Sequence, residues 1–456
     1  MKAQNRWIFL IATLLLVILI AACGGSGEET AVSEPDTSPT TQDTEEVTEN
    51  TEEVDAVGQC TDALSGQVVE MWSPLTGPDG DEMSGLAVRF SEENPYGITV
   101  NHVAQPEYVQ KLNTAAAADQ LPTMTVVRVI NVAELAERNV LSPMSAATLA
   151  VFGDGIASEF PANVWDAGQY AGERYSFPLD MHPLVMYYNK DLFAQAGLEE
   201  PGTTPMTREE FEQALQALAD SGVEPIAIGT AFQGATLFQS FIQQFGGSLT
   251  DEAGTQATFD SEAAAEALAY VNSLKQQYSP EISGGGDPEV NVFKQGNAAI
   301  VIHGPWHISD IQKLPFAGFA PLPQVGEQYA VWGGSHQLAL TTDDPEQQLA
   351  AACWISWLSE NSIDWAKAGQ VPARNSVRLS PELAEVAAPI AAVAPTTDSV
   401  VILPQVAELE GALWGQFGPV VDAVLMGEMS DVEAGLADAV GKSQQIIDEN
   451  KERYGG

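Results

Sequence analysis

Basic residues are scarce in this chain. Its 456 residues include 18 Lys and Arg against 63 Asp and Glu, so the formal net charge is −45 at neutral pH. No basic residue stands between Arg6 and Arg89. Such an acidic chain repels nucleic acid and anionic lipid, and it disfavours an anionic ligand unless a local basic pocket overrides the general field. We therefore expect no nucleic-acid partner.

Common signatures of catalysis and cofactor binding are also missing. Neither G-x-S-x-G nor H-E-x-x-H occurs. His303 and His307 are four residues apart, but Gly304 and Pro305 between them forbid the helix that would align both rings on one metal ion. We expect no enzyme, no cofactor and no metal ion. A carboxylate pair for glycoside hydrolysis remains an alternative because acidic residues are so numerous.

The N-terminus has the pattern of a secretory signal. Lys2 and Arg6 precede residues 7–23, which carry no charge and end in Ile20-Ala21-Ala22-Cys23. A basic start, an apolar stretch and small residues are typical of such segments, and the ending resembles the bacterial lipobox. We predict a lipoprotein signal peptide at 1–22 and lipid attachment at Cys23. An uncleaved anchor helix is the alternative, and either way the remaining chain lies outside the cytoplasm.

Residues 23–58 are rich in Gly, Ser, Thr, Pro, Glu and Asp, with almost no large apolar side chain. Such a stretch cannot bury enough surface to offset its ordering entropy, and its charges repel one another. We predict a disordered acidic tether that spaces a folded body from the membrane. An acidic recruitment tail is the rival interpretation.

The remaining part, about 390 residues, is too long for one small domain. Segments with the character of strands, such as 68–72 and 225–229, alternate with helical patterns. Thr207 to Glu210 and Ser430 to Glu433 have the form of capping boxes at helix starts. This alternation predicts an α/β fold with mostly parallel sheets, and the length favours two lobes.

Several motifs, in order along residues 66–450, resemble those of carbohydrate-type solute-binding proteins of ABC importers, the family of maltose, multiple-sugar and glycerol-phosphate binders. One such motif would be weak, but several in the right order are specific. The motifs are VEMWSPLTGPDG at 69–80, YSFPLDMHP at 175–183, YYNKDLF at 187–193, FKQGNAAI at 293–300 with GPW at 304–306, GQVPA at 369–373, and LP at 403–404 with GALW at 411–414.

The resemblance implies a two-lobe periplasmic-binding-protein fold of type II character, with hinge crossings and a ligand cleft between the lobes. Lobe 1 would comprise 59–178 and about 332–366, and lobe 2 about 179–331 and 367–456. Cys60 and Cys353 would then share lobe 1, which favours a disulfide, although both thiols could also be free. The implied partner is an ABC permease. The implied place is the outer face of the cytoplasmic membrane, or the periplasm, and we expect a monomer.

The resemblance also implies ligand-binding residues. Sugars present apolar C–H faces ringed by hydroxyl groups, so their sites combine flat aromatic rings with polar side chains. The aromatic candidates are Trp306 after its strand, Trp332 at the second crossing, and Trp414 in the C-terminal portion. Ordinary core packing is the alternative for any tryptophan, and it is our expectation for Trp354, Trp357 and Trp365.

Polar candidates come from the crossings and strand ends. Arg128 interrupts an apolar strand, which indicates either a ligand contact or a structural ion pair. Maltodextrin-binding relatives carry a carboxylate where His182 stands, so this chain departs from their pattern. The polar candidates are Arg128, Asn131, Asp180, His182, His336, Thr76, Asp79 and Arg374.

We therefore predict a carrier that captures a mono- or oligosaccharide outside the cell and delivers it to a permease. Three alternatives stay open: a binder of a polyol phosphate or polyamine, a receptor that signals without transport, and a lipid-anchored glycoside hydrolase. A phosphate ligand would require more clustered arginine than these motifs offer.

Overall fold

The computed structural model describes residues 59–454. The predicted signal peptide, Cys23 and the whole of the predicted acidic tether lie outside the described residues. Within 59–454, no helix is both long enough and apolar enough to cross a membrane.

One sheet contains five strands in the order β2-β1-β3-β13-β6. β1 pairs in parallel with β2 and β3, whereas β13 is antiparallel to β3 and β6. The helices α1 and α2 connect the parallel strands. The bounds are β1 Val68–Ser73, α1 Pro78–Glu93, β2 Thr99–Ala104, α2 Tyr108–Ala117, β3 Met124–Arg128, β6 Ser176–Pro178 and β13 His336–Leu340.

A second sheet has the order β11-β8-β10-β9. Here β10 is parallel to β9, and β8 is antiparallel to both β10 and β11. Both sheets are therefore mixed, and the expectation of mostly parallel sheets was wrong because β8 and β13 enter their sheets from crossing segments rather than from βαβ units. The bounds are β8 Val185–Asn189, β9 Ile226–Ala227, β10 Ile300–His303 and β11 Ala317–Pro321.

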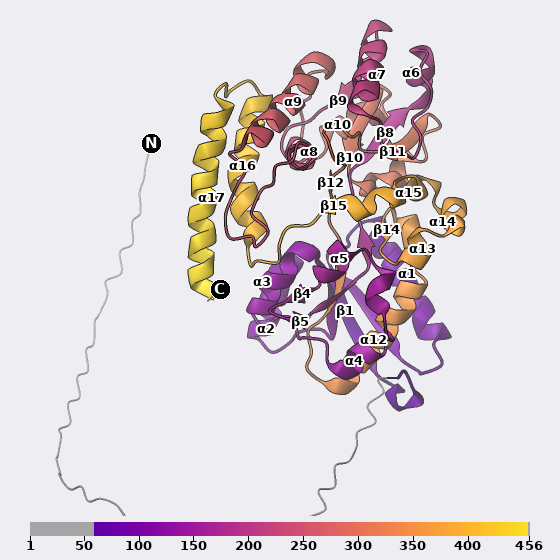
Figure 1. Ribbon diagram of the computed structural model, residues 1–456. Helices are drawn as coiled ribbons and strands as arrows, with labels where there is room; N and C mark the ends of the chain where they lie inside the picture. Colours follow the sequence, from indigo (N-terminus) through magenta and orange to yellow (C-terminus); the bar gives the residue numbers. More distant parts are fainter. Residues whose placement is uncertain (1–58, 455–456) are drawn as a thin grey trace, which may run out of the picture. The chain divides into compact units, whose positions relative to one another are not determined.

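The chain passes between the two sheets along crossing segments (Figure 1). The first runs from β6 to β8 through β7, and the second from β11 to β13 through β12. After α12, β14 pairs with β7, and later β15 pairs with β12, so the crossings support one another. The bounds are β7 Asp180–Met181, β12 Val331–Trp332, α12 Pro345–Glu360, β14 Val371–Pro372 and β15 Val400–Val401. The residue boundaries of the two lobes remain a prediction.

Helices around the second sheet carry much of the apolar core. The capping box predicted at α7 is present, because Thr207 accepts a hydrogen bond from the Glu210 N–H and the Glu210 side chain accepts one from the Thr207 N–H. At α17 the cap is one residue later than expected, since the Asp431 carboxylate accepts from the Ala434 N–H. The bounds are α7 Arg208–Asp220, α8 Phe232–Gln244, α9 Glu262–Tyr278, α16 Leu409–Leu425 and α17 Val432–Tyr454.

Shorter elements complete the described chain. The 3-10 helices are η1 Asp62–Leu64, η2 Val129–Asn131, η3 Ile156–Glu159, η4 Pro305–His307, η5 Trp365–Ala368 and η6 Ala394–Ser399. The remaining helices and strands are α3 Val132–Glu137, α4 Ala146–Ala150, α5 Ala162–Asp166, β4 Gln169–Tyr170, β5 Glu173–Arg174, α6 Lys190–Gln195, α10 Pro288–Lys294, α11 Ile308–Ile311, α13 Asn375–Arg378, α14 Pro381–Val386 and α15 Ala388–Val393.

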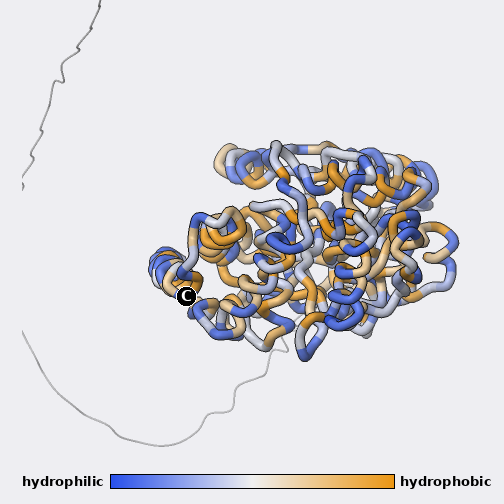
Figure 2. The backbone as a smooth tube through the Cα atoms, turned by 90° about the horizontal axis from the view of Figure 1, so that it is seen from above, coloured by the Kyte–Doolittle hydropathy of each residue, from blue (hydrophilic) through white to orange (hydrophobic). Residues whose placement is uncertain are grey.

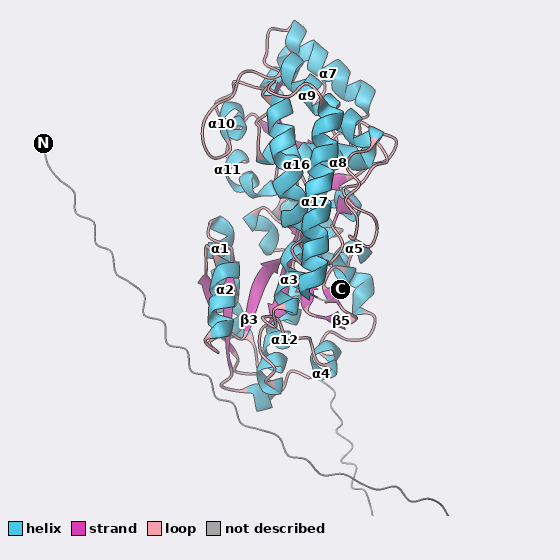
Figure 3. Ribbon diagram, turned by 90° about the vertical axis from the view of Figure 1, so that its left-hand side faces the viewer, coloured by secondary structure: helices cyan, strands magenta, loops and turns pink. Residues whose placement is uncertain are grey.

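Each sheet has its own apolar core. Phe90 on α1 and Trp354 on α12 pack against the first sheet, while α8, α9 and α16 enclose a second core with Phe238 and Phe417. Figure 2 shows hydrophobic and hydrophilic residues interleaved along the elements, as expected for helices with one buried face. α16 and α17 lie side by side against this core (Figures 1 and 3).

Cys60 and Cys353 form a disulfide in this structure, with their Cα atoms 5.8 Å apart. The bridge joins the start of the described chain to α12, which packs on the first sheet. Trp354 and Trp365 are fully buried and Trp357 is partly buried, so these tryptophans belong to the core, as expected.

Candidate ligand-binding site

A cavity of about 820 Å³ lies beside the crossing segments, between the end of β3 and the helices α8 and α16. Its lining comes from the end of β3, the crossings, the start of α8, η4 and α16. Predicted residues that line it are Asp79, Arg128, His182, Trp306, Trp332, His336 and Trp414, and further lining residues include Phe232, Gln239, Ser335, Gln370, Glu410 and Asp422.

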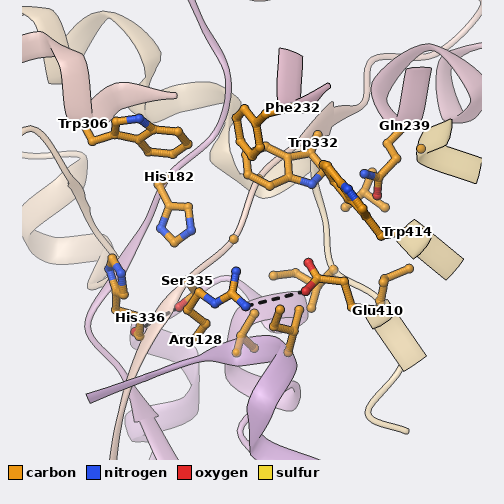
Figure 4. A pocket seen from close by; sticks show the side chains of 18 of the residues that line it. Arg128, His182, Phe232, Gln239, Trp306, Trp332, Ser335, His336, Glu410 and Trp414 are labelled. Carbon is orange, nitrogen blue, oxygen red and sulfur yellow. Dashed lines mark hydrogen bonds and ion pairs between the residues drawn. The ribbon is translucent and has the colours of Figure 1, made fainter. Parts of the chain in front are cut away.

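Aromatic rings form one side of the cavity (Figure 4). Phe232 is their common neighbour: its ring centroid lies 5.7 Å from Trp306, 5.3 Å from Trp332 and 5.9 Å from Trp414. The ring of Phe232 is nearly parallel to that of Trp414 and meets Trp332 edge-on. Three predicted tryptophans and one aromatic residue that sequence analysis missed are thus brought together from separate elements.

Polar side chains lie opposite the rings (Figure 4). The Arg128 guanidinium is half-exposed, and its Nη2 lies 3.7 Å from Oε2 of Glu410. Burial raises the pKa of Glu410 above its ordinary value, although the charge of Arg128 opposes this effect. The ion-pair interpretation of Arg128 therefore applies. The pair also faces the cavity, where Arg128 offers hydrogen-bond donors and Glu410 offers acceptors.

Asp180 is fully buried and does not line the cavity, so its predicted direct contact with a ligand is corrected. One carboxylate oxygen accepts the backbone N–H of His336 at 2.9 Å. The other accepts Nδ1–H of His336 and Nε1–H of Trp365, each at 2.8 Å. With these donors satisfying it, the carboxylate has no need of a ligand. Its role is to hold His336, whose ring lines the cavity.

The charges of Asp180, His182 and His336 influence one another. Burial alone would raise the pKa of Asp180, but attraction to His336 and hydrogen bonds from His182 and His336 outweigh it and hold that pKa well below its usual range. Burial tends to lower the pKa of His336, yet the Asp180 carboxylate raises it above the ordinary value. Burial lowers the pKa of His182, whose ring lies 4.8 Å from that of His336.

The other predicted polar residues lie elsewhere. Asn131 is buried and accepts the hydroxyl of Tyr108. Thr76 is exposed on the loop before α1 and does not line the cavity. Arg374 does not line the cavity. Its Nε lies 3.4 Å from the Glu159 carboxylate, which balances its charge. These three are therefore corrected as site residues.

Helix geometry explains two of the lining residues that the sequence analysis missed, Glu410 and Gln239. Glu410 is four residues before Trp414 on α16, and Gln239 is seven residues after Phe232 on α8, so each shares a face with an aromatic lining residue. The spacing from Trp414 could have indicated Glu410. Phe232 carried no sequence signal, because its position depends on where α8 begins.

The structure also corrects the argument against His303 and His307. His303 ends β10 and His307 ends η4, and together with Asp287 they offer atoms that all lie within 4.8 Å of one another. No continuous helix is needed, because the Gly304-Pro305 turn folds the second ring back beside the first.

A model of the bacterial extracellular solute-binding protein family matches residues 85–392. The maltodextrin-binding protein MdxE of Bacillus subtilis is 22% identical over 314 residues, which cover 65% of this chain and 71% of that protein. The sn-glycerol-3-phosphate-binding periplasmic protein UgpB of Salmonella typhimurium is 25% identical over 337 residues, 68% of this chain and 75% of that protein.

Solved structures share the fold. The sugar-binding protein MalE of Xanthomonas citri has a TM-score of 0.74 with 24% identity, covering 85% of this chain and 99% of that one. The GacH receptor of Streptomyces glaucescens, solved unliganded and with acarbose, has a TM-score of 0.70 with 24% identity, covering 83% and 98%.

Proposed function

The chain belongs to the family of bacterial extracellular solute-binding proteins, and we propose that it captures an uncharged oligosaccharide outside the cytoplasmic membrane and delivers it to the permease of an ABC importer. The observation that carries this proposal is the group of aromatic rings around one cavity. Trp306, Phe232, Trp332 and Trp414 come from different elements, yet all face the same space.

The chemistry of the cavity suits a sugar. Aromatic faces stack on the C–H faces of a pyranose ring, while amide, imidazole, guanidinium and carboxylate groups satisfy its hydroxyls. Arg128 and Glu410 supply such groups across from the rings, and His182 and Gln239 supply them beside the rings. The volume of about 820 Å³ lies in the upper part of the usual range for ligand pockets, about 300–1,000 Å³. That size favours an oligosaccharide over a single ring.

A phosphate ligand fits less well. Among the described lining residues, Arg128 is the one permanent cation, and Asp79, Glu410 and Asp422 are acidic. A phosphate group needs clustered donors, preferably more than one arginine, to offset its desolvation. The glycerol-phosphate specificity named for one relative is therefore not our proposal for this chain.

A polyamine is the second candidate, and the same three carboxylates favour it. Ammonium groups are attracted both to carboxylates and to aromatic faces. However, Glu410 already faces Arg128, and Asp422 accepts the backbone N–H of Ala231. Both groups are thus partly engaged before any ligand arrives, and we favour the uncharged sugar.

Delivery would use the crossing segments as a hinge. They connect two separately packed cores, and hinge closure around a ligand is a common motion of such architectures. We further propose a signal peptide at 1–22, lipid attachment at Cys23 and a tether at 23–58, so that a monomeric, non-catalytic body stays beside its permease.

A thermal-shift screen of the purified protein tests the proposal. The panel contains neutral mono- and oligosaccharides, glycerol 3-phosphate, spermidine and chromogenic glycosides. We expect a neutral oligosaccharide to raise the melting temperature most, with no release of chromophore. Stabilisation by spermidine or glycerol 3-phosphate alone would contradict the proposal, and chromophore release would indicate a hydrolase.

A further inference from the structure

Behind the aromatic side of the cavity lies a group of side chains that the proposed function does not use. Asp287 stands just before α10, His303 ends β10 and His307 ends η4. Their ligand-type atoms all lie within 4.8 Å of one another. Glu289 joins the group, since its Oε1 is 3.4 Å from Nε2 of His303.

Three buried ring nitrogens of this group have no hydrogen-bond partner among the described residues. Only 1% of the His303 side chain is exposed, and neither of its ring nitrogens makes a hydrogen bond within residues 59–454. Nε2 of His307 is likewise buried without such a bond. Buried polar atoms are nearly always satisfied in folded proteins, so these ring nitrogens are suited to binding a ligand.

The spacing fits a tetrahedral metal ion. Bonds of about 2.0–2.1 Å at tetrahedral angles separate ligand atoms by roughly 3.3 Å. Here Nε2 of His307 is 3.2 Å from Oδ2 of Asp287, and Nε2 of His303 is 3.5 Å from Oδ1 of Asp287 and 3.4 Å from Glu289. The histidine nitrogens are thus as far from the carboxylate oxygens as two ligands of one metal ion would be. They are not oriented to form hydrogen bonds with those oxygens.

We propose that Asp287, His303 and His307, with Glu289 beside His303, bind a divalent transition-metal ion, for which Zn²⁺ has the most suitable coordination chemistry. Two imidazoles with carboxylates are a typical zinc donor set, whereas Mg²⁺ and Ca²⁺ prefer oxygen ligands alone. The chain's net charge of −45 also attracts cations.

The site has an entry and an adjustable side. Asp287 is 38% exposed and His307 17%, so an ion can reach the buried His303 from their side. Asp287 follows Gly284-Gly285-Gly286, of which the first and last have positive φ, so this loop can shift to tighten the coordination.

The ion would brace the wall of the ligand cavity. Trp306 lies in the chain between the two histidines, and its ring is 5.5 Å from that of His303. Phe232 lies 5.2 Å from the same ring. An ion that fixes the 303–307 turn would therefore fix two aromatic lining residues, so metal and sugar should strengthen each other's binding. This coupling rests on the proposed function, whereas the metal site itself does not.

The test is a zinc titration of metal-stripped protein without a histidine tag, in competition with a chromogenic chelator. We expect one Zn²⁺ per chain, no competition from Mg²⁺, and at least tenfold weaker binding in His303→Ala, His307→Ala and Asp287→Asn. Asp287→Asn guards against misfolding, because its side chain is partly exposed. His102→Ala is the matched control, since His102 lies apart and bonds to Ser73 and Ser84.

The outcomes separate the alternatives. Absence of zinc binding would show that His303 is instead a cation held between Asp287 and Glu289, and would overturn the proposal. Zinc binding that survives all three substitutions but is lost in His336→Ala would place the ion beside Asp180 and would also overturn it. Sugar affinity measured with and without Zn²⁺ then tests the coupling, and failure of the sugar proposal leaves the zinc titration valid.

Discussion

His336 donates both its backbone N–H and its ring Nδ1–H to the carboxylate of Asp180, at 2.9 and 2.8 Å. Asp180 is fully buried, while the ring of His336 lines the ligand cavity. The carboxylate also accepts Nε1–H of Trp365, a core residue in η5. The buried Asp180 carboxylate therefore holds His336 in place and links the crossing segments to the core through Trp365.

Asp180→Asn should destabilise the protein by on the order of 3 kcal/mol, because it breaks a buried, hydrogen-bonded charge pair. The pKa of Asp180 is depressed, so its contribution is complete above about pH 3.9, the unfolded value, and is lost as pH falls further. The pKa of His336 is raised, so its contribution is complete below about pH 6.5 and is lost as pH rises through the folded value.

Thermal melts of the unchanged protein and of Asp180→Asn should be compared from pH 3 to 9. Their melting temperatures should differ most between about pH 4 and 6.5, and the difference should narrow on either side. A constant difference across this range would show that the carboxylate charge does not act through His336.

Trp306→Ala and Phe232→Ala should each weaken oligosaccharide binding by roughly 1–3 kcal/mol, which is the cost of truncating an aromatic anchor in a binding pocket. Isothermal titration measures the loss. Trp357→Ala is the control, because this tryptophan lies on α12, packs against Phe90 and is not among the residues that line the cavity. Equal affinity in all variants would remove the aromatic wall from the binding site.

Glu410→Gln should separate a neutral ligand from a cationic one. A hydrogen bond to a charged group contributes about 1.5–3 kcal/mol, so a polyamine would lose about tenfold or more in affinity, whereas a neutral sugar keeps an amide partner and loses much less. Glu428→Gln removes the same charge at an exposed turn and is the matched control.

The salt dependence of the affinity is an independent test of whether the ligand is neutral or charged. Between 0.1 and 1 M NaCl the Debye length falls from about 10 to 3 Å, which should leave the affinity for a neutral sugar changed by less than about twofold. Affinity that falls steeply with salt would point to a charged ligand.

Reduction of the Cys60–Cys353 disulfide should lower stability by about 3–5 kcal/mol, because the bridge closes a very long loop in the unfolded chain. Melting curves with and without a reductant measure the effect, and Cys60→Ser should show no further loss on reduction. Mass mapping that finds both thiols free in the native protein would contradict the bridge.

Cys23→Ser should release the protein from the cell surface, since the predicted acyl chains provide the membrane affinity. Fractionation and labelling with a fatty-acid analogue check this outcome. A variant that stays membrane-bound and unprocessed would favour the uncleaved anchor helix.

Local chemistry made much of the fold predictable. The capping box at Thr207 depends on residues three apart in sequence, and it is present in the structure. The motifs that contain Trp306 and Trp414, and the place of Trp332 at the second crossing, likewise identified residues that line one cavity. Strand direction was less accessible, because antiparallel pairing of β8 and β13 depends on how the crossings enter each sheet.

The site was only partly predictable because burial and orientation are tertiary properties. Sequence places Asp180 in the crossing segment but does not reveal that His336 and Trp365 occupy both carboxylate oxygens. Phe232 depends on the start of α8. Gly304 and Pro305 exclude a continuous helix through His303 and His307, but a strand end and a tight turn bring the two rings together.

A crystal structure with the tightest-binding solute from the panel tests the central claim most directly. We expect a neutral oligosaccharide whose rings stack on Trp306 and Trp414 and whose hydroxyls reach Arg128 and Glu410. A charged solute in this cavity, or a sugar bound away from both tryptophans, would contradict the account.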